Sequence, residues 1–124
     1  MAMEKNRVLI IEDDESVQEL LKTGLEGYGF SIEIATDEKT CKEILERTRP
    51  DIIIMDISLP GIDGISLCRE IKLTPGFKEI PVIMMTAYHD NKIQNDSFLC
   101  GAIDYIIKPI KIEELKEKIL KYIK

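Results

Sequence analysis

The chain has 124 residues, of which 44% are hydrophobic and 32% are charged, and its formal net charge is −6. This length suits one folded domain, and the negative charge disfavours direct binding to nucleic acid or to anionic lipid. No apolar run reaches the roughly 18 residues of a membrane span, and the one before Glu12 is too short for a signal peptide.

Three cysteines, Cys41, Cys68 and Cys100, are odd in number and widely spaced. Each lies in a helical pattern beside apolar neighbours, so we expect all three to pack in the core. This use of cysteine suits a reducing compartment, and we therefore expect a cytoplasmic protein.

The first strand and helix are predicted from residues 8–29. The run VLII at residues 8–11 is too short for a helix core and has the unbroken hydrophobicity of a strand buried on both faces. Asp14 is the expected N-cap of the helix that follows, and Gly27 and Gly29 end it. Five apolar residues recur in this helix at helical spacing: Val17, Leu20, Leu21, Leu25 and Tyr28.

The middle of the chain predicts two more strand-then-helix units. Residues 31–35 alternate as a short strand, expected at a sheet edge, before an amphipathic helix that stops near Pro50. Residues 51–57 form the most hydrophobic strand. A turn over residues 59–64 follows, and then a helix patterned on Ile65, Cys68 and Ile71.

The remaining residues predict the last two units. Residues 82–86 are the fourth strand, and residues 90–101 have the weakest helical pattern, so we expect the most mobile helix there. Residues 104–108 are the fifth strand. The final helix has one apolar stripe, made by Ile112, Leu115, Ile119 and Ile123.

Five such units in succession predict a doubly wound α/β fold with a five-stranded parallel sheet, of the flavodoxin-like (βα)5 type. The common strand order for this arrangement is 2-1-3-4-5. Ligands bind beyond the carboxyl ends of such strands, so residues that follow the strands should meet at one edge.

Those strand ends carry Glu12, Asp13, Asp56, Thr86 and Lys108. Two unit charges 4 Å apart repel by roughly 4 kcal/mol at an effective dielectric near 20, so the carboxylates need a cation. Mg²⁺ suits them, because it binds one or two carboxylates and pairs with phosphate oxygens. Asp56 ends the most buried strand and can act as a nucleophile toward phosphorus, while Lys108 and Thr86 can contact phosphoryl oxygens.

With these residues at its strand ends, the chain resembles the receiver domain of bacterial two-component response regulators. The resemblance covers the whole chain and rests on four segments in the family's order: VLIIEDDE, DIIIMDISLPGIDG, VIMMTA and DYIIKP. It implies that Asp56 accepts a phosphoryl group from a phosphohistidine on a sensor histidine kinase or phosphotransfer domain. It also implies that Asp13, Asp56 and the backbone carbonyl of Ser58 bind Mg²⁺, with Glu12 acting through a metal-bound water.

The same resemblance implies a conformational switch rather than an enzyme with its own substrate. Tyr105 matches the aromatic residue expected to turn inward when Thr86 moves toward the phosphoryl group, and the Lys108–Pro109 peptide is expected to be cis. A downstream target should bind the face made by the fourth helix, the fifth strand and the fifth helix. No output domain follows within residues 1–124.

A homodimer on phosphorylation is compatible with the resemblance. However, Ile103 stands where the winged-helix subfamily commonly has an aspartate of its dimer interface, which puts that dimer in doubt. Near the site, Tyr88 is predicted to shield the phosphoaspartate from water, and His89 is expected to face solvent.

Three other functions are weighed against this prediction. A flavodoxin-type electron carrier needs a loop that binds phosphate after the first strand, where EDDE would repel FMN. A phosphatase of the haloacid-dehalogenase type needs a second aspartate where Ser58 stands. A pseudo-receiver that works without phosphorylation usually lacks the acidic pair, the phosphoacceptor or the lysine, all of which this chain keeps.

Overall fold

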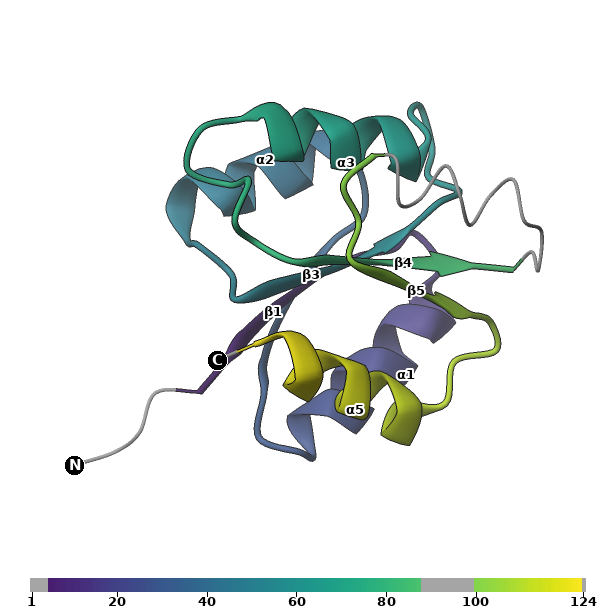
Figure 1. Ribbon diagram of the computed structural model, residues 1–124. Helices are drawn as coiled ribbons and strands as arrows, with labels where there is room; N and C mark the ends of the chain where they lie inside the picture. Colours follow the sequence, from purple (N-terminus) through teal and green to yellow (C-terminus); the bar gives the residue numbers. More distant parts are fainter. Residues whose placement is uncertain (1–4, 88–99, 124) are drawn as a thin grey trace.

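Figure 1 shows the computed structural model, which describes residues 5–87 and 100–123. Its strands are β1 (Arg7–Ile11), β2 (Ser31–Ala35), β3 (Ile52–Asp56), β4 (Val82–Thr86) and β5 (Asp104–Ile107). Its helices are α1 (Glu15–Glu26), α2 (Glu38–Arg47), α3 (Gly64–Leu73) and α5 (Ile112–Tyr122). The helix predicted over residues 90–101, and the positions of Tyr88 and His89, lie outside the described residues.

The strands form one parallel sheet in the order β2-β1-β3-β4-β5. Helices α2 and α3 cover one face of the sheet, and α1 and α5 cover the other (Figure 1). This arrangement confirms the doubly wound fold and the predicted strand order, and it places β2 at an edge as expected.

Successive side chains of the inner strands point to opposite faces of the sheet and pack in two separate apolar cores. The core under α2 and α3 takes Leu9, Ile11, Ile53, Met55, Val82 and Met84. The core under α1 and α5 takes Val8, Ile10, Ile52, Ile54, Ile83 and Met85. Because both faces are covered, every residue of β3 and β4 is buried, which explains why these strands are continuously hydrophobic.

Helix α1 begins as predicted, but its apolar face is narrower than expected. The Asp14 Oδ1 atom accepts hydrogen bonds from the backbone N–H groups of Ser16 at 2.9 Å and Val17 at 3.2 Å, which confirms Asp14 as the N-cap. The prediction was wrong for Leu20 and Tyr28, which are 49% and 47% exposed. Leu20 is turned by about 100° from the buried Leu21, and Tyr28 follows the end of the helix.

All three cysteines are buried, as the sequence predicted, and none is in a disulfide. They belong to the core under α2 and α3. The predicted stripe of the last helix is also confirmed, since Leu115 and Ile119 are fully buried and Ile112 and Ile123 pack beside them.

Candidate functional site

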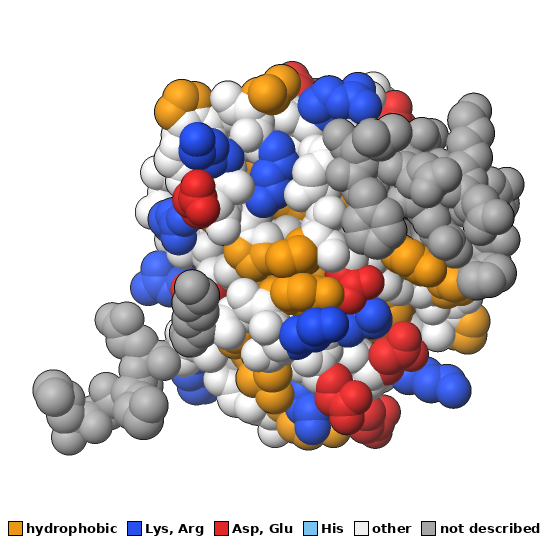
Figure 2. Space-filling view, viewed as in Figure 1, with side chains coloured by type: hydrophobic (Ala, Val, Ile, Leu, Met, Phe, Trp, Pro, Cys, Tyr) orange, Lys and Arg blue, Asp and Glu red, His pale blue; other side chains and the backbone are white. Residues whose placement is uncertain are grey.

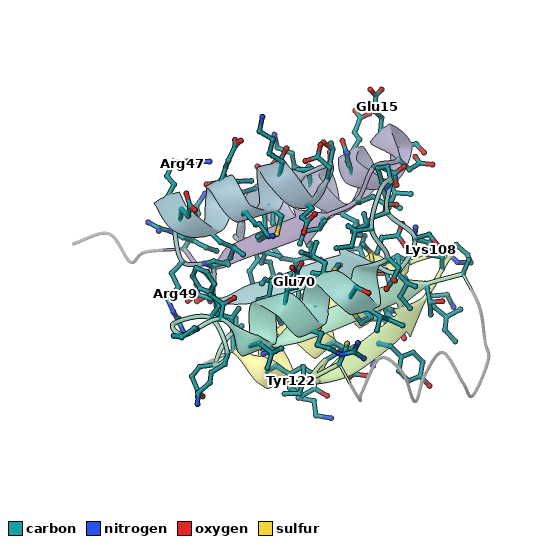
Figure 3. All side chains as sticks on the ribbon, turned by 90° about the horizontal axis from the view of Figure 1, so that it is seen from above. Glu15, Arg47, Arg49, Glu70, Lys108 and Tyr122 are labelled. Atoms are coloured by element: carbon teal, nitrogen blue, oxygen red, sulfur yellow. The ribbon has the colours of Figure 1, made fainter. Side chains whose placement is uncertain are left out.

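Four strand ends meet at one edge of the sheet. Glu12 follows β1, Asp56 ends β3, Thr86 ends β4 and Lys108 follows β5. In Figure 3, Lys108 lies at the same end of the molecule as Glu15, which begins α1, and opposite Arg47 and Arg49. The backbone N–H of Lys108 donates to the Thr86 carbonyl at 2.7 Å, so the pairing of β5 with β4 sets where the lysine emerges.

Lys108 bridges two buried carboxylates. Its Nζ atom lies 2.9 Å from Glu12 Oε1 and 3.1 Å from Asp56 Oδ2. Glu12 is fully buried, and Asp56 and Thr86 are 6% and 2% exposed. Burial lowers the pKa of Lys108, but the hydrogen bonds to the two carboxylates outweigh it and leave this pKa above its ordinary value. Lys108 is therefore a charged, positioned cation.

Glu12 is the most constrained of the carboxylates. Burial, the largest cause, and the neighbouring Asp56 together raise its pKa to about 8, while Lys108 opposes the shift. Its Oε1 atom accepts from Lys108, whereas its buried Oε2 atom has no hydrogen-bond partner among the described residues. A buried carboxylate oxygen without a partner is costly, and a cation beside it would offset that cost.

The carboxylates of Glu12, Asp13 and Asp56 are close enough to hold a metal ion. One oxygen from each lies within 4.8 Å of the others, and Asp13 is exposed while the other two are buried. Oxygen ligands of this kind, with one open side, suit Mg²⁺. The donor set and the unpaired Glu12 oxygen thus fit the predicted metal. The roles of the Ser58 carbonyl and of a water on Glu12 stay predictions.

The loop after β3 is shaped around Asp56. The Ser58 backbone N–H donates to Asp56 Oδ1 at 3.1 Å, and the Gly64 N–H donates to the Ile57 carbonyl at 2.6 Å. A Cβ on Gly64 would lie 2.1 Å from the Asp56 carbonyl oxygen, so only glycine fits there. Sequence reasoning assigned Gly64 only to a turn. The position of Gly64 directly after Asp63, the N-cap of α3, was the feature of the sequence that could have indicated its role.

A second polar cluster, which the sequence analysis missed, joins β5 to α5. Asp104 Oδ2 accepts from Lys118 Nζ at 3.1 Å and from the Tyr122 hydroxyl at 2.8 Å. Burial raises the pKa of Asp104, but these bonds and the Tyr105 N–H more than offset it, so this pKa is lowered. Tyr105 itself is partly buried and packs against the core under α2 and α3. The expected cis peptide between Lys108 and Pro109 is present.

The family comparison decides what kind of domain carries this site. Residues 8–120 match the family model of the response regulator receiver domain. The chain belongs to the receiver domain family. None of the helices in residues 5–87 and 100–123 is long and apolar enough to cross a membrane.

Receiver domains with known sequences and structures are similar over nearly the whole chain. The regulatory protein AtoC of Escherichia coli (strain K12) is 36% identical over 110 residues, 89% of this chain and 23% of AtoC. The receiver domain of a signal transduction histidine kinase from Syntrophus aciditrophicus is 37% identical with a TM-score of 0.86, covering 94% of this chain and 89% of that one.

A third relative contains a bound metal. The receiver domain of a sensor histidine kinase from Pseudomonas aeruginosa PAO1 is 28% identical with a TM-score of 0.87, covering 96% of this chain and 98% of that one. That structure has a magnesium ion coordinated in its active-site cleft. The chain spans from 18% to 49% of the length of the first curated relatives it matches, so these are longer proteins.

Proposed function

We propose that this receiver domain is a phosphoacceptor switch of a two-component system, with Asp56 as the phosphorylated residue. The observation that carries the proposal is the position of Asp56, which is almost fully buried beside Lys108 and in one cluster with Glu12 and Asp13. A carboxylate held in this way is shielded from competing reactions and lies next to a fixed cation.

The donor is a phosphohistidine on a sensor histidine kinase or phosphotransfer domain. An Asp56 carboxylate oxygen bonds to phosphorus, the P–N bond breaks, and its electron pair returns to the imidazole nitrogen. Asp13, Asp56 and the Ser58 carbonyl, with Glu12 acting through a bound water, would hold Mg²⁺, which would neutralise charge on the phosphoryl oxygens. Lys108 and the Thr86 hydroxyl contact the same oxygens, and the domain catalyses only its own phosphorylation and hydrolysis.

Phosphorylation then shifts the domain between two conformations. Moving a population from 1:99 to 99:1 takes roughly 5.5 kcal/mol of differential binding, which several charge-assisted contacts can supply. Thr86 and Tyr105 are the switch residues, and β5 and α5 are the described part of the face that binds a downstream target. The domain acts in the cytoplasm, without direct binding to nucleic acid.

The test is phosphorylation by acetyl phosphate and Mg²⁺, followed by intact mass spectrometry. The wild type should gain one phosphoryl group, Asp56→Asn should gain none, and Asp14→Asn should behave as the wild type because Asn also caps a helix. No gain in the wild type would contradict the proposal and favour a phosphorylation-independent module. Multiple turnover of p-nitrophenyl phosphate would instead favour a phosphatase.

A further inference from the structure

Two of the buried cysteines are paired across elements that lie far apart in the sequence. Cys68 is in α3, and Cys100 lies just before β5. The Cys68 Sγ atom lies 3.6 Å from the Cys100 carbonyl oxygen, to which it donates, and each of the two thiols shifts the pKa of the other. In Figure 1 the light-green start of the segment that leads into β5 runs beside α3. Cys68 and Cys100 are therefore neighbours in the folded domain.

Contacts around the pair hold it in place. An added Cβ on Gly101 would lie 2.8 Å from the Lys72 side chain, which shows how closely the residue after Cys100 approaches α3. Lys72 Nζ in turn donates to the backbone carbonyls of Lys78, at 3.1 Å, and Ile80. Lys72 thus connects α3 to the chain that enters β4, while its stem packs against Gly101.

The two thiols are electrostatically different. The neighbouring Cys68 thiol lowers the pKa of Cys100 to about 7 against the opposing effect of burial, and the positive charge of Arg69 adds to this effect. The Cys100 thiol, together with burial, raises the pKa of Cys68. Cys100 is thus the member that ionises first, and a thiolate is the form that reacts with oxidants. Burial raises the pKa of Cys41 to about 12, which makes that thiol a poor nucleophile.

We infer that Cys68 and Cys100 form an oxidation site, which a peroxide converts into a disulfide between α3 and the segment before β5. The Cys100 sulfur attacks one peroxide oxygen, the O–O bond breaks, and one water and a Cys100 sulfenic acid result. The Cys68 sulfur then bonds to the Cys100 sulfur and displaces the second water. In total two thiols lose two hydrogens and two electrons, and one hydrogen peroxide is reduced to two waters.

This inference is independent of phosphorylation, because neither cysteine belongs to the Asp56 site. Disulfides in a reducing compartment are usually transient and redox-sensing, which is the behaviour expected of this pair. The bond would tie α3, whose first residue packs under Asp56, to the chain that leads into β5 and Lys108. Oxidation would therefore restrain both sides of the switch.

The test treats the full chain with hydrogen peroxide and counts the thiols that remain in denaturant. The reduced chain has three thiols, Cys41, Cys68 and Cys100. We expect one to remain, with a loss of two hydrogens in intact mass and a Cys68–Cys100 cross-linked peptide in the digest. The melting temperature should rise and return to its starting value with dithiothreitol.

Single substitutions separate this pair from other thiol chemistry. Cys68→Ser and Cys100→Ser should lose the cross-link, and Cys41→Ser, the matched control, should keep it. Three thiols persisting in the treated wild type, a cross-link to Cys41, or oxygen gain without a cross-link would each overturn the inference. If Cys100→Ser does not fold, the peptide map of the wild type decides alone.

Discussion

Lys108 is shared between two carboxylates that come from different strands, and this sharing governs the electrostatics of the site. One ammonium neutralises one unit of charge, while Glu12, Asp13 and Asp56 together can carry three. Burial is the largest cause of the raised pKa of Glu12, and the negative charge of Asp56 adds to it. The site is therefore ready for a further cation.

The consecutive acids after β1 should have separate roles. Asp13→Asn should weaken Mg²⁺ binding at least about tenfold, because it removes a ligand charge from the cluster. Asp14→Asn should leave the affinity within about twofold, since Asp14 caps α1 and Asn caps equally well. Isothermal titration with MgCl2 measures both. Loss of binding in Asp14→Asn alone would reverse the assignment.

Glu12 should make the metal-free domain less stable as the pH rises. Its folded pKa, about 8, is above the ordinary value of 4.5, so the folded state keeps a proton that the unfolded state loses. Stability from this group is present below about pH 4.5 and is lost as the pH rises toward 8. Urea unfolding in EDTA should show a loss above about 1 kcal/mol over this range, because one pKa unit corresponds to roughly 1.4 kcal/mol.

In Glu12→Gln this part of the pH dependence should be absent, because the amide does not titrate. The comparison uses the same buffers and EDTA throughout. A wild-type stability that is constant or increases between pH 5 and 8 would contradict the raised pKa.

At the scale of elements, the junction of β3 with α3 holds Asp56, the proposed phosphoacceptor, in place. Gly64→Ala places a methyl group against the Asp56 carbonyl, and the backbone has to move. Overpacking of this kind costs typically about 1–3 kcal/mol, so the unfolding free energy in urea should fall by that amount. Mg²⁺ affinity should fall with it. Gly27→Ala is the control, because Gly27 has an ordinary helical φ of −61° and lies outside the site.

The hydrogen bond that joins β5 to α5 can be tested by removing the Tyr122 hydroxyl. Tyr122→Phe removes the bond to Asp104 and should cost about 0.5–1.5 kcal/mol in urea unfolding at pH 7. Since the folded pKa of Asp104 is lowered, the cost should shrink as the pH falls through that pKa. Tyr28→Phe, where the ring keeps its contact with Lys116, should change little. Equal losses of unfolding free energy in the two variants would show that the hydrogen bond from Tyr122 to Asp104 does not stabilise the domain.

At the scale of the whole molecule, metal binding and folding are linked because the cluster exists only when β1 and β3 are paired. At a Mg²⁺ concentration of 100 times its dissociation constant, the native state gains about 2.7 kcal/mol. For a domain of this size that gain should raise the melting temperature by about 10 °C. Scanning calorimetry with and without MgCl2 measures the shift. A shift of equal size in Asp13→Asn would show that Mg²⁺ binds elsewhere.

The face of the molecule in Figure 2 is compatible with the proposal that this domain does not bind nucleic acid directly. Figure 2 shows acidic and basic side chains interspersed over one face of the molecule, and the net charge of the chain is −6. Interspersed charges of both signs do not make the continuous basic surface that phosphate backbones require.

The sequence by itself determined the fold class and the chemistry of the strand ends. Continuous hydrophobicity in β3 and β4 indicated strands covered on both faces, and the residues after each strand marked the site before any contact was known. These inferences succeed because a parallel strand covered on both faces must be continuously hydrophobic. The carboxyl ends of parallel strands also lie at the same edge of the sheet, where ligands bind.

Only the tertiary structure decided which of these groups contact each other and how. The bridge from Lys108 to Glu12 and Asp56, the unpaired Glu12 oxygen and the close approach of Gly64 all depend on the relative positions of separate strands. The pair Cys68 and Cys100 and the Asp104 cluster also join distant positions. Local sequence patterns record burial and capping, whereas contacts between elements are set by sheet order and helix packing, which no short segment encodes.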